Sequence, residues 1–238
     1  MKSALVTGAS RGIGSSIASA LAREGYDLIL TCHTREAALD ALAESLSAQY
    51  GVHTTARCGD ISSPAFVDRL FSDIDRLDVL INNAGISYLG LLQDMTPEQW
   101  DRVMSVNLTA PFLTCRRAIP LMLRAGGGSI VNISSMWGRC GASMEVAYSA
   151  SKGGLNMMTR ALAKELAPSS IQVNALACGV VDTEMNSFLT DEERAQLCEE
   201  IPSGRFARPD EVGEAVVSII KAGPYMTGQV IGFDGAFV

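Results

Sequence analysis

Tyr148 and Lys152 stand four residues apart in the chain. In a helix this spacing places both side chains on one face, one turn from each other. An ammonium group beside a phenol stabilises the phenolate, so we expect Lys152 to lower the pKa of Tyr148. A tyrosine tuned in this way can give a proton to a carbonyl oxygen, or take one from a hydroxyl, near neutral pH. The alternative is a surface pair, because the same spacing occurs by chance in many helices.

A serine precedes this pair at the end of an apolar run. Ser135 closes the segment 129–135, whose apolar residues predict a strand. From there its hydroxyl can donate a hydrogen bond to the oxygen that Tyr148 would protonate. Ser134 is the neighbouring candidate for the same task.

Glycines at positions 8, 12 and 14 follow the first apolar run, residues 3–7, and open a helical pattern over 12–24. A strand, a glycine turn and a helix in this order let the backbone approach a pyrophosphate at the helix N-terminus. The spacing G-x-x-x-G-x-G differs from the G-x-G-x-x-G of the common dinucleotide motif. A glycine loop that only closes a turn is therefore the alternative.

The end of the second expected strand, residues 27–32, bears on the choice of cofactor. A site for NAD places Asp or Glu there to bind the ribose hydroxyls, whereas this chain has His33 and Arg35. Arg11, in the glycine loop, adds a second guanidinium, and guanidinium groups bind phosphate well. We therefore expect NADP(H) rather than NAD(H), the alternative being that Arg35 only begins a solvated helix face.

Asp60 follows the third expected strand. From that place it can touch the adenine edge of a dinucleotide. It is equally suited to be the N-cap of a helix over 63–75.

Short apolar runs alternate with helical patterns along the chain. The expected strands are 3–7, 27–32, 52–58, 78–82, 129–134, 171–176 and 229–233, and the expected helices are 12–24, 36–50, 63–75, 97–124, 147–167 and 209–222. This alternation predicts an α/β fold, a single Rossmann-type doubly wound parallel sheet with helices on both faces. No linker or repeat interrupts it, so residues 1–238 are expected to form one NADP-binding domain.

One long segment, residues 178–208, lacks a clear pattern and contains Pro202 and Gly204. It is too long for an ordinary connection between elements. We expect either a functional lid near 184–208 or a helix that the pattern does not reveal.

Composition limits the function classes. The 238 residues are 47% hydrophobic and 19% charged, which is enough apolar material for a core and excludes a largely disordered chain. The net charge of −7 argues against nucleic-acid binding, which needs clustered Lys and Arg. The six cysteines include no C-x-x-C pair, and no metal site is expected. The first apolar run is too short for a signal peptide and no run is long enough to span a membrane, so we expect a cytoplasmic protein.

Further residues complete a series of motifs: Asn82–Gly85 ends the fourth expected strand, and Asn107 lies within 97–124. Together with Thr7–Gly14, Ser135, Tyr148 and Lys152, they resemble the short-chain dehydrogenase/reductase family in its single-domain branch. The resemblance covers the whole chain in order and implies a sheet of seven parallel strands. It also implies a catalytic tetrad of Asn107, Ser135, Tyr148 and Lys152.

The roles in this tetrad follow from the resemblance. Tyr148 would be the general acid in reduction, and Ser135 would orient and polarise the carbonyl. Lys152 would bind ribose and lower the pKa of Tyr148, and Asn107 would anchor a water of the proton relay. The gap from Ser135 to Tyr148 matches the family better than the gap from Ser134.

The glycine loop, the cationic residues and the resemblance together give a cofactor-binding set. Its members are Gly8, Ser10, Arg11, Gly12, Ile13, Gly14, His33, Arg35, Asp60, Ile61, Asn83, Ala84, Gly85, Tyr148, Lys152, Gly179, Val181 and Thr183. Cys178-Gly179 stands where the family usually has Pro-Gly, and we expect a buried small thiol there rather than a redox group.

Within the family, Met226–Gln229 and Ile201–Arg205 resemble the bacterial 3-oxoacyl-[acyl-carrier-protein] reductases. That resemblance implies an NADPH-dependent carbonyl reductase acting on 3-oxoacyl thioesters. Those reductases have basic residues where the acidic carrier docks, but only Arg124 is basic in the matching stretches 124–128 and 167–170. The resemblance therefore implies the thioester chemistry more strongly than carrier docking.

Other ketones stay open as substrates. Ser134–Gly138 and Gly141–Val146 resemble a subgroup that reduces a 5-aminopentanone group on elongation factor P. Glu145 would suit the amine of such a substrate, or it is a solvated loop carboxylate. An apolar wall of Met185, Phe188, Leu189 and Trp137 would suit an acyl or hydroxysteroid ketone, or these residues only pack the lid shut. A small diketone is a further alternative, and a non-catalytic NADP sensor is the alternative from another class.

The resemblance also implies a homotetramer that pairs through helices 97–124 and 147–167 and through the last strand. The apolar tail, Val230–Phe233 with Phe237 and Val238, fits a subunit contact or plain core.

Overall fold

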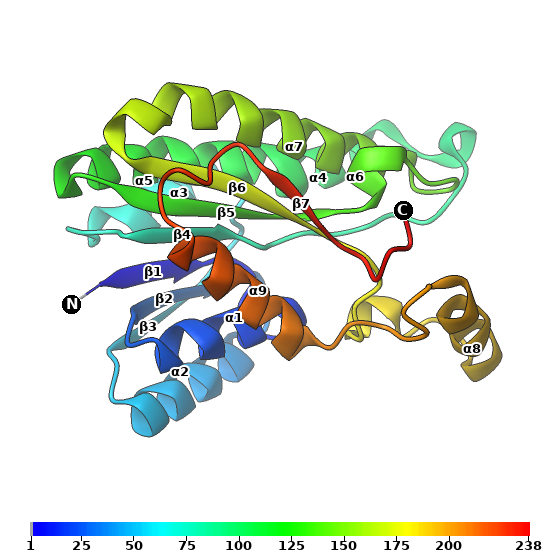
Figure 1. Cartoon of the computed structure of the whole chain (residues 1–238), viewed down its shortest axis with the longest axis horizontal. Helices are drawn as coiled ribbons and strands as arrows, with labels where there is room; N and C mark the ends of the chain where they lie inside the picture. Colours follow the sequence, from blue (N-terminus) through cyan, green and yellow to red (C-terminus); the bar gives the residue numbers. More distant parts are fainter. Residues whose placement is uncertain (1) are drawn as a thin grey trace.

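The computed structural model describes residues 2–238 and contains one sheet of seven parallel strands (Figure 1). The strands are β1 (Ser3–Val6), β2 (Asp27–Cys32), β3 (Thr54–Cys58), β4 (Val79–Asn82), β5 (Gly128–Ser135), β6 (Ile171–Cys178) and β7 (Val230–Phe233). Their order, β3-β2-β1-β4-β5-β6-β7, confirms the doubly wound Rossmann-type fold. The strand order reverses between β1 and β4, and ligands of such sheets bind outside the carboxyl ends at this point.

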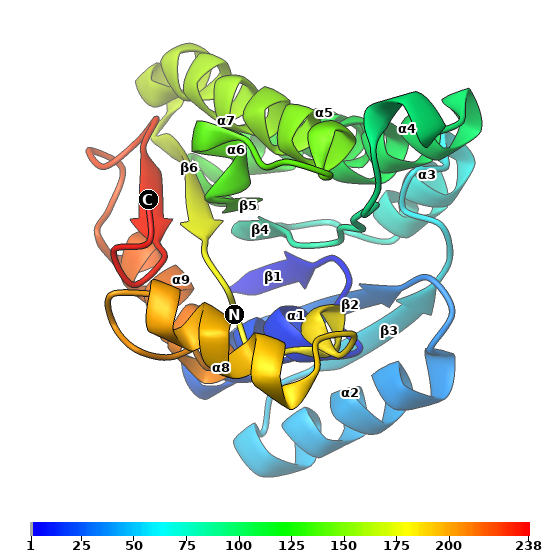
Figure 2. The same ribbon diagram turned by 90° about the vertical axis from the view of Figure 1, so that its right-hand side faces the viewer.

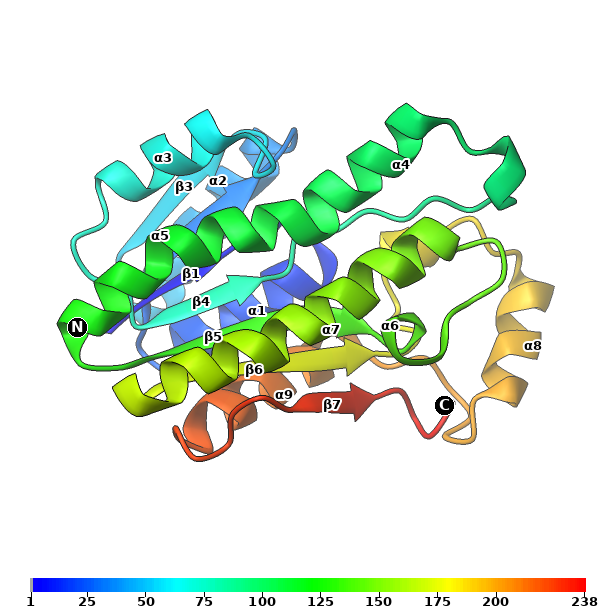
Figure 3. The same cartoon turned by 90° about the horizontal axis from the view of Figure 1, so that it is seen from above.

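Helices cover both faces of the sheet (Figures 1 and 3). One face carries α1 (Gly12–Arg23), α2 (Glu36–Tyr50) and α9 (Pro209–Lys221), and the other carries α3 (Pro64–Ser72), α4 (Pro97–Met104), α5 (Ala110–Ala125) and α7 (Val146–Leu166). Each face buries its own apolar cluster, with Leu30 and Val216 in the first and Leu80 and Ile130 in the second. Burial on both faces is why the strands are nearly continuous apolar runs.

The helix expected over 97–124 contains a wider π-type turn, Ser105–Thr109, between α4 and α5. The helix starts where expected because Thr96 forms a capping box with Gln99. It ends at Gly126, whose φ of 80° suits a left-handed C-cap. Helical periodicity does not reveal an inserted residue, and such turns are frequent at functional sites. Asn107 lies within this one.

The segment 178–208 contains a helix that the pattern did not reveal, α8 (Asp191–Glu200). Thr190 caps it: its hydroxyl accepts from the Glu193 N–H at 3.2 Å, and the Glu193 carboxylate accepts from the Thr190 N–H at 2.9 Å. None of its ten residues is buried, so it has no apolar face that periodicity could show. Figures 2 and 3 show α8 lying outside the sheet, and Figure 3 shows it on the side toward which the strands point.

Shorter elements complete the structure: η1 (Leu92–Asp94), α6 (Trp137–Cys140), η3 (Ala167–Ser169) and η4 (Glu184–Asn186). Across residues 2–238, no helix combines the length and apolarity that crossing a bilayer requires. The same residues include no group of three or more His, Cys, Asp and Glu side chains placed to hold a metal ion.

Candidate active site

A cavity of about 600 Å³ opens at the carboxyl ends of the strands. All the residues expected to bind the cofactor line it, and so do Ser135, Tyr148 and Lys152. Asn107 differs from the rest of the expected set, because it is fully buried behind the cavity wall. The fold therefore brings residues from distant parts of the chain to one site.

The glycine loop is held in a close approach to the neighbouring strand. A Cβ at Gly14 would lie 2.2 Å from the Gly8 carbonyl oxygen, which only glycine allows. Asn83 Nδ2 donates to the carbonyls of Thr7 and Gly8 at 2.9 and 3.0 Å. The Thr7 hydroxyl accepts from the N–H groups of Asn83 and Ala84, both at 3.0 Å. The Asn83 side chain therefore fixes the shape of the loop.

Arg11 and Arg35 converge on a single carboxylate. Arg35 Nη1 and Nη2 lie 3.2 and 2.9 Å from Glu184 Oε1 and Oε2, and Arg11 Nη1 also pairs with Oε2. Hydrogen bonds from Arg35, and then from Arg11, hold the pKa of Glu184 below its ordinary value. Two guanidiniums on one anion is the arrangement that a phosphate group needs. The third expected cationic residue, His33, lies beside Asp60, with Nε2 3.9 Å from Asp60 Oδ2.

Asp60 lines the cavity, and it is not the N-cap of α3. Ser63 takes that place, because its hydroxyl accepts from the Phe66 N–H at 3.4 Å. Asp60 accepts from the N–H and hydroxyl of Ser62 at 2.9 and 2.7 Å, and from Arg102 Nη1 at 2.7 Å. Burial raises the pKa of Asp60, but these hydrogen bonds outweigh it and leave the pKa lowered. Sequence reasoning missed Arg102, which comes from another helix.

The raised pKa of Tyr148 keeps its phenol protonated at neutral pH. Burial raises its pKa above the ordinary value, and a hydrogen bond with Ser135 offsets part of the rise. The expected lowering of this pKa by Lys152 was wrong, because Lys152 Nζ donates to the Ile133 carbonyl at 2.8 Å and lies 5.7 Å from the Tyr148 ring centre. Ser134, the other serine candidate, has a buried hydroxyl without a hydrogen-bond partner among the described residues.

Lys152 is buried, and burial lowers its pKa to about 8. Its ammonium has three donors, and the Ile133 carbonyl accepts one of them. The other donors can serve a ligand, because the side chain lines the cavity.

For the carbonyl reduction that the sequence resemblance implies, we expect kcat/KM to be flat below a pH of about 8 and to fall above it. Lys152 loses its charge in that range, whereas Tyr148 keeps its proton because its pKa is raised. A pH profile of the wild type and of Lys152→Arg checks this, since arginine stays charged. The variant should have a lower plateau and no fall near pH 8. An unchanged fall in the variant would assign the titration to another group.

Asn107 links the π-type turn to Ile86, after β4, and to Ser151 of α7. Its Nδ2 donates to the Ile86 carbonyl at 2.8 Å and to the Ser151 hydroxyl at 3.0 Å, and its Oδ1 accepts from the Ile86 N–H at 2.9 Å. A Cβ at Gly85 would lie 3.5 Å from Asn107 Oδ1 and 3.4 Å from Lys152 Nζ. The amide oxygen and the ammonium therefore border the same space.

Part of the cavity wall combines apolar side chains with an acid. Met185, Phe188 and Leu189 come from the segment 178–208, and Trp137 comes from α6. Glu145 lines the cavity, is partly buried, and has no ion-pair partner within residues 2–238. Burial raises its pKa.

Cys178 lines the cavity at the end of β6 and is almost fully buried. Burial raises the pKa of its thiol to about 12, so the thiol is protonated at neutral pH. These properties agree with the expected small buried thiol.

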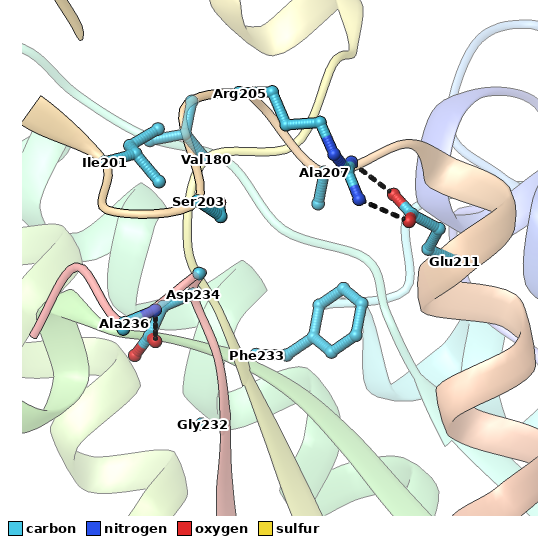
Figure 4. A pocket seen from close by; sticks show the side chains of 11 residues that line it. Val180, Ile201, Ser203, Arg205, Ala207, Glu211, Gly232, Phe233, Asp234 and Ala236 are labelled. Atoms are coloured by element: carbon cyan, nitrogen blue, oxygen red, sulfur yellow. Dashed lines mark hydrogen bonds and ion pairs between the residues drawn. The ribbon is translucent and has the colours of Figure 1, made fainter. Parts of the chain in front are cut away.

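A second hollow of about 360 Å³ lies between the stretch 201–207 and the chain end 232–236, as shown in Figure 4. Val180, Ile201 and Phe233 give it apolar walls. Its rim carries Arg205, which is paired with Glu211 at 2.7 and 2.8 Å. That ion pair neutralises the charge of Arg205 at the rim, and Ser203 and Asp234 add polar groups to the lining.

Comparison with known proteins decides the family. The profile of the short chain dehydrogenase family matches residues 2–194. An uncharacterized oxidoreductase of Bacillus subtilis (strain 168), YmfI, is 40% identical over 238 residues, covering 99% of this chain and 98% of that protein. The chain belongs to the short-chain dehydrogenase family. This confirms the resemblance found in the sequence and makes the chain an oxidoreductase.

Two further proteins are similar to this short-chain dehydrogenase. The 3-oxoacyl-[acyl-carrier-protein] reductase FabG of Aquifex aeolicus (strain VF5) is 39% identical over 239 residues, covering 98% of this chain and 96% of that protein. A Beutenbergia cavernae protein, described as an NAD(P)-dependent gluconate 5-dehydrogenase, has a crystal structure with bound NADP at low occupancy. It superposes with a TM-score of 0.92 at 36% identity, covering 99% of this chain and 96% of that one.

The residues of this short-chain dehydrogenase fit a phosphorylated dinucleotide. The glycine loop leaves no room for side chains where a pyrophosphate would approach. Arg11 and Arg35 already hold an anion between them. Lys152 has donors to spare beside the expected nicotinamide end.

Proposed function

We propose that the chain is an NADPH-dependent carbonyl reductase whose substrate is a 3-oxoacyl thioester. The observation that carries the proposal is the meeting of Tyr148, Ser135 and Lys152 in the lining of one cavity, where burial keeps the Tyr148 phenol protonated. When bound, the cofactor supplies a hydride to the carbonyl carbon. A phenol that keeps its proton at neutral pH is suited to act as the acid in the reductive direction.

In this proposal Tyr148 gives its proton to the carbonyl oxygen of the substrate. The Ser135 oxygen accepts from the Trp137 N–H at 3.2 Å, so its own proton is free to point toward Tyr148 or the substrate. Ser135 therefore orients the carbonyl and polarises it. Lys152 binds the ribose hydroxyls with the donors that Ile133 leaves free. Asn107 holds a water that links Lys152 to solvent.

Three parts of the cavity support binding of the cofactor. The glycine loop at the N-terminus of α1 takes the pyrophosphate. Arg11 and Arg35 bind the 2′-phosphate, in the place that the Glu184 carboxylate holds in this structure. Val181 and Thr183 border the nicotinamide end of the cavity. NADP bound to the similar Beutenbergia cavernae protein supports the same choice.

The name and similarity of the FabG relative support a 3-oxoacyl thioester as the substrate. The test is NADPH oxidation, followed by absorbance, with an acetoacetyl thioester offered free and bound to acyl carrier protein. Turnover of both forms supports a thioester substrate. Faster turnover of the carrier-bound form also supports docking of the acyl carrier protein. Binding of NADPH without turnover of either thioester would overturn this substrate and leave the reductase chemistry to be tested on other ketones.

A second candidate substrate is the 5-aminopentanone group on elongation factor P. Glu145 favours it, because an unpaired, partly buried carboxylate beside Tyr148 suits a cationic substrate group. For free 5-amino-2-pentanone, we expect Glu145→Gln to raise KM by about tenfold, the usual size of a charged hydrogen bond.

The control for this prediction is Glu44→Gln, which removes the same charge from an exposed position on α2. It should leave KM for the amino ketone unchanged. Equal effects of the two variants, or an equal loss for a ketone without an amine, would contradict recognition of the amine by Glu145.

The exposed apolar side chains on the helical faces support assembly of the chain into a homotetramer. Phe112 and Leu123 of α5 and Met157 of α7 are each about half exposed. Contact between copies through these helices would cover them.

A further inference from the structure

Glu184 lies where the 2′-phosphate of NADP(H) is proposed to bind. Its carboxylate contacts the guanidiniums of both Arg11 and Arg35, and the contact with Arg35 uses both oxygens. These three residues come from the glycine loop, the start of α2 and the lid, so the contact joins the lid to the cofactor site. A carboxylate and a phosphate compete for the same guanidinium donors, because both are oxyanions of similar geometry.

The lid is attached differently at its two ends. At its base, the Ala207 N–H donates to the Val180 carbonyl at 3.0 Å, and the Asp182 N–H donates to the Ala207 carbonyl at 2.8 Å. The Ser203 N–H also donates to the Gly235 carbonyl at 3.2 Å, on the chain end drawn in Figure 4. These backbone bonds hold the base of the lid on the sheet.

The first turn of the lid lacks such a tie to the sheet. Its backbone hydrogen bonds are local: the N–H groups of Asn186, Ser187 and Leu189 donate to the carbonyls of Thr183, Glu184 and Asn186 at 3.0, 3.1 and 3.3 Å. One side-chain bond reaches the base of the lid, from Asn186 Nδ2 to the Val181 carbonyl at 2.8 Å. Met185 and Phe188 are largely exposed. The ion pairs of Glu184 are therefore the contacts that join this turn to the glycine loop and to the start of α2.

We propose that Glu184 occupies the 2′-phosphate site of the cofactor-free protein, and that NADP(H) displaces it and releases the first turn of the lid. The inference rests on the assignment of Arg11 and Arg35 to the 2′-phosphate. A phosphate carries more negative charge than a carboxylate and has three acceptor oxygens. It therefore displaces the Glu184 carboxylate from the two guanidiniums. NAD(H) has no such group and leaves the ion pairs intact. Glu184 thus reduces the preference of the enzyme for NADP(H) over NAD(H).

Binding of adenosine 2′,5′-bisphosphate and of adenosine 5′-diphosphate measures the competition without any catalysis. We expect Glu184→Gln to bind the 2′,5′-bisphosphate about fivefold more tightly than the wild type, as exposed ion pairs allow. Its affinity for the 5′-diphosphate should not change. Glu192→Gln, on the exposed side of α8, removes the same charge from the lid and should change neither affinity.

Hydrogen exchange measures the release of the lid. The 2′,5′-bisphosphate should speed exchange at the amides of Asn186, Ser187 and Leu189 in the wild type, and the 5′-diphosphate should not. In Glu184→Gln these amides should already exchange fast and respond to neither compound. Slower exchange on binding of the 2′,5′-bisphosphate would contradict release of the lid.

Arg35→Gln separates failure of this inference from failure of the phosphate assignment. It should weaken binding of the 2′,5′-bisphosphate and spare the 5′-diphosphate. If Arg35→Gln has no effect, the 2′-phosphate does not bind at Arg35 and the assignment fails. If Arg35→Gln weakens binding while Glu184→Gln leaves it unchanged, the assignment stands and the role of Glu184 is overturned.

Discussion

Tyr148→Phe is expected to lower kcat for ketone reduction by about 10³-fold, within the range that a general acid contributes. The substitution removes only the phenol hydroxyl and keeps the ring that lines the cavity. Binding of NADPH should therefore stay close to that of the wild type. Steady-state kinetics with a reactive ketone, together with a fluorescence titration of NADPH, measure both quantities.

Tyr225→Phe is the matched control, because the Tyr225 side chain is fully exposed and outside the cavity. It should leave kcat unchanged. A Tyr148→Phe protein that reduces ketones at the wild-type rate would remove Tyr148 from the chemistry. If the cellular function were also unchanged in that variant, the non-catalytic NADP sensor would become the better account of the chain.

Gly14→Ala is expected to cost about 3 kcal/mol of folding free energy, the upper range for an overpacked site. A Cβ there would lie 2.2 Å from the Gly8 carbonyl oxygen and 2.6 Å from Asn83 Nδ2. The first contact is with backbone, so α1 must move away from the loop. Because Asn83 also shapes this loop, we expect the variant to lose measurable affinity for NADPH as well. Thermal unfolding and the same NADPH titration test the two effects.

Gly153→Ala is the control for that prediction. A Cβ at Gly153 would meet its nearest described neighbour, the Gly138 carbonyl oxygen, at an ordinary 3.6 Å. It lies inside α7, where alanine is the better helix former by about 1 kcal/mol. The variant should be as stable as the wild type or more stable. A Gly14→Ala protein that unfolds at the same temperature as Gly153→Ala would contradict the tight packing of the loop.

Local patterns in the sequence were enough to predict most of the fold. Strand and helix positions followed from apolar periodicity, and the two cavity ends followed from the glycine loop and from Tyr148 with Lys152. The helix α8 was not predicted, because its residues are exposed and mostly acidic or polar, and apolar periodicity reveals only a helix with a buried face. Its capping box, Thr190 with Glu193, was a signal that could have located it.

Contacts between distant residues could not be predicted in this way. The spacing of Tyr148 and Lys152 indicated that they are neighbours, but the burial that dominates both pKa values depends on the whole fold. The pairing of Asp60 with Arg102, and of Glu184 with two arginines, joins segments that no local pattern relates. These long-range pairs decide how charge is arranged in the cavity.

Transfer of deuterium from NADPH labelled at both C4 positions tests the central claim most directly. The labelled cofactor is incubated with an acetoacetyl thioester and with 5-amino-2-pentanone, and the alcohols are analysed by mass spectrometry. If the chain is a carbonyl reductase, at least one alcohol carries one deuterium on its carbinol carbon, and Tyr148→Phe forms almost none of it. NADPH consumed without label in either alcohol, or an equal yield from Tyr148→Phe, would contradict the proposed reaction.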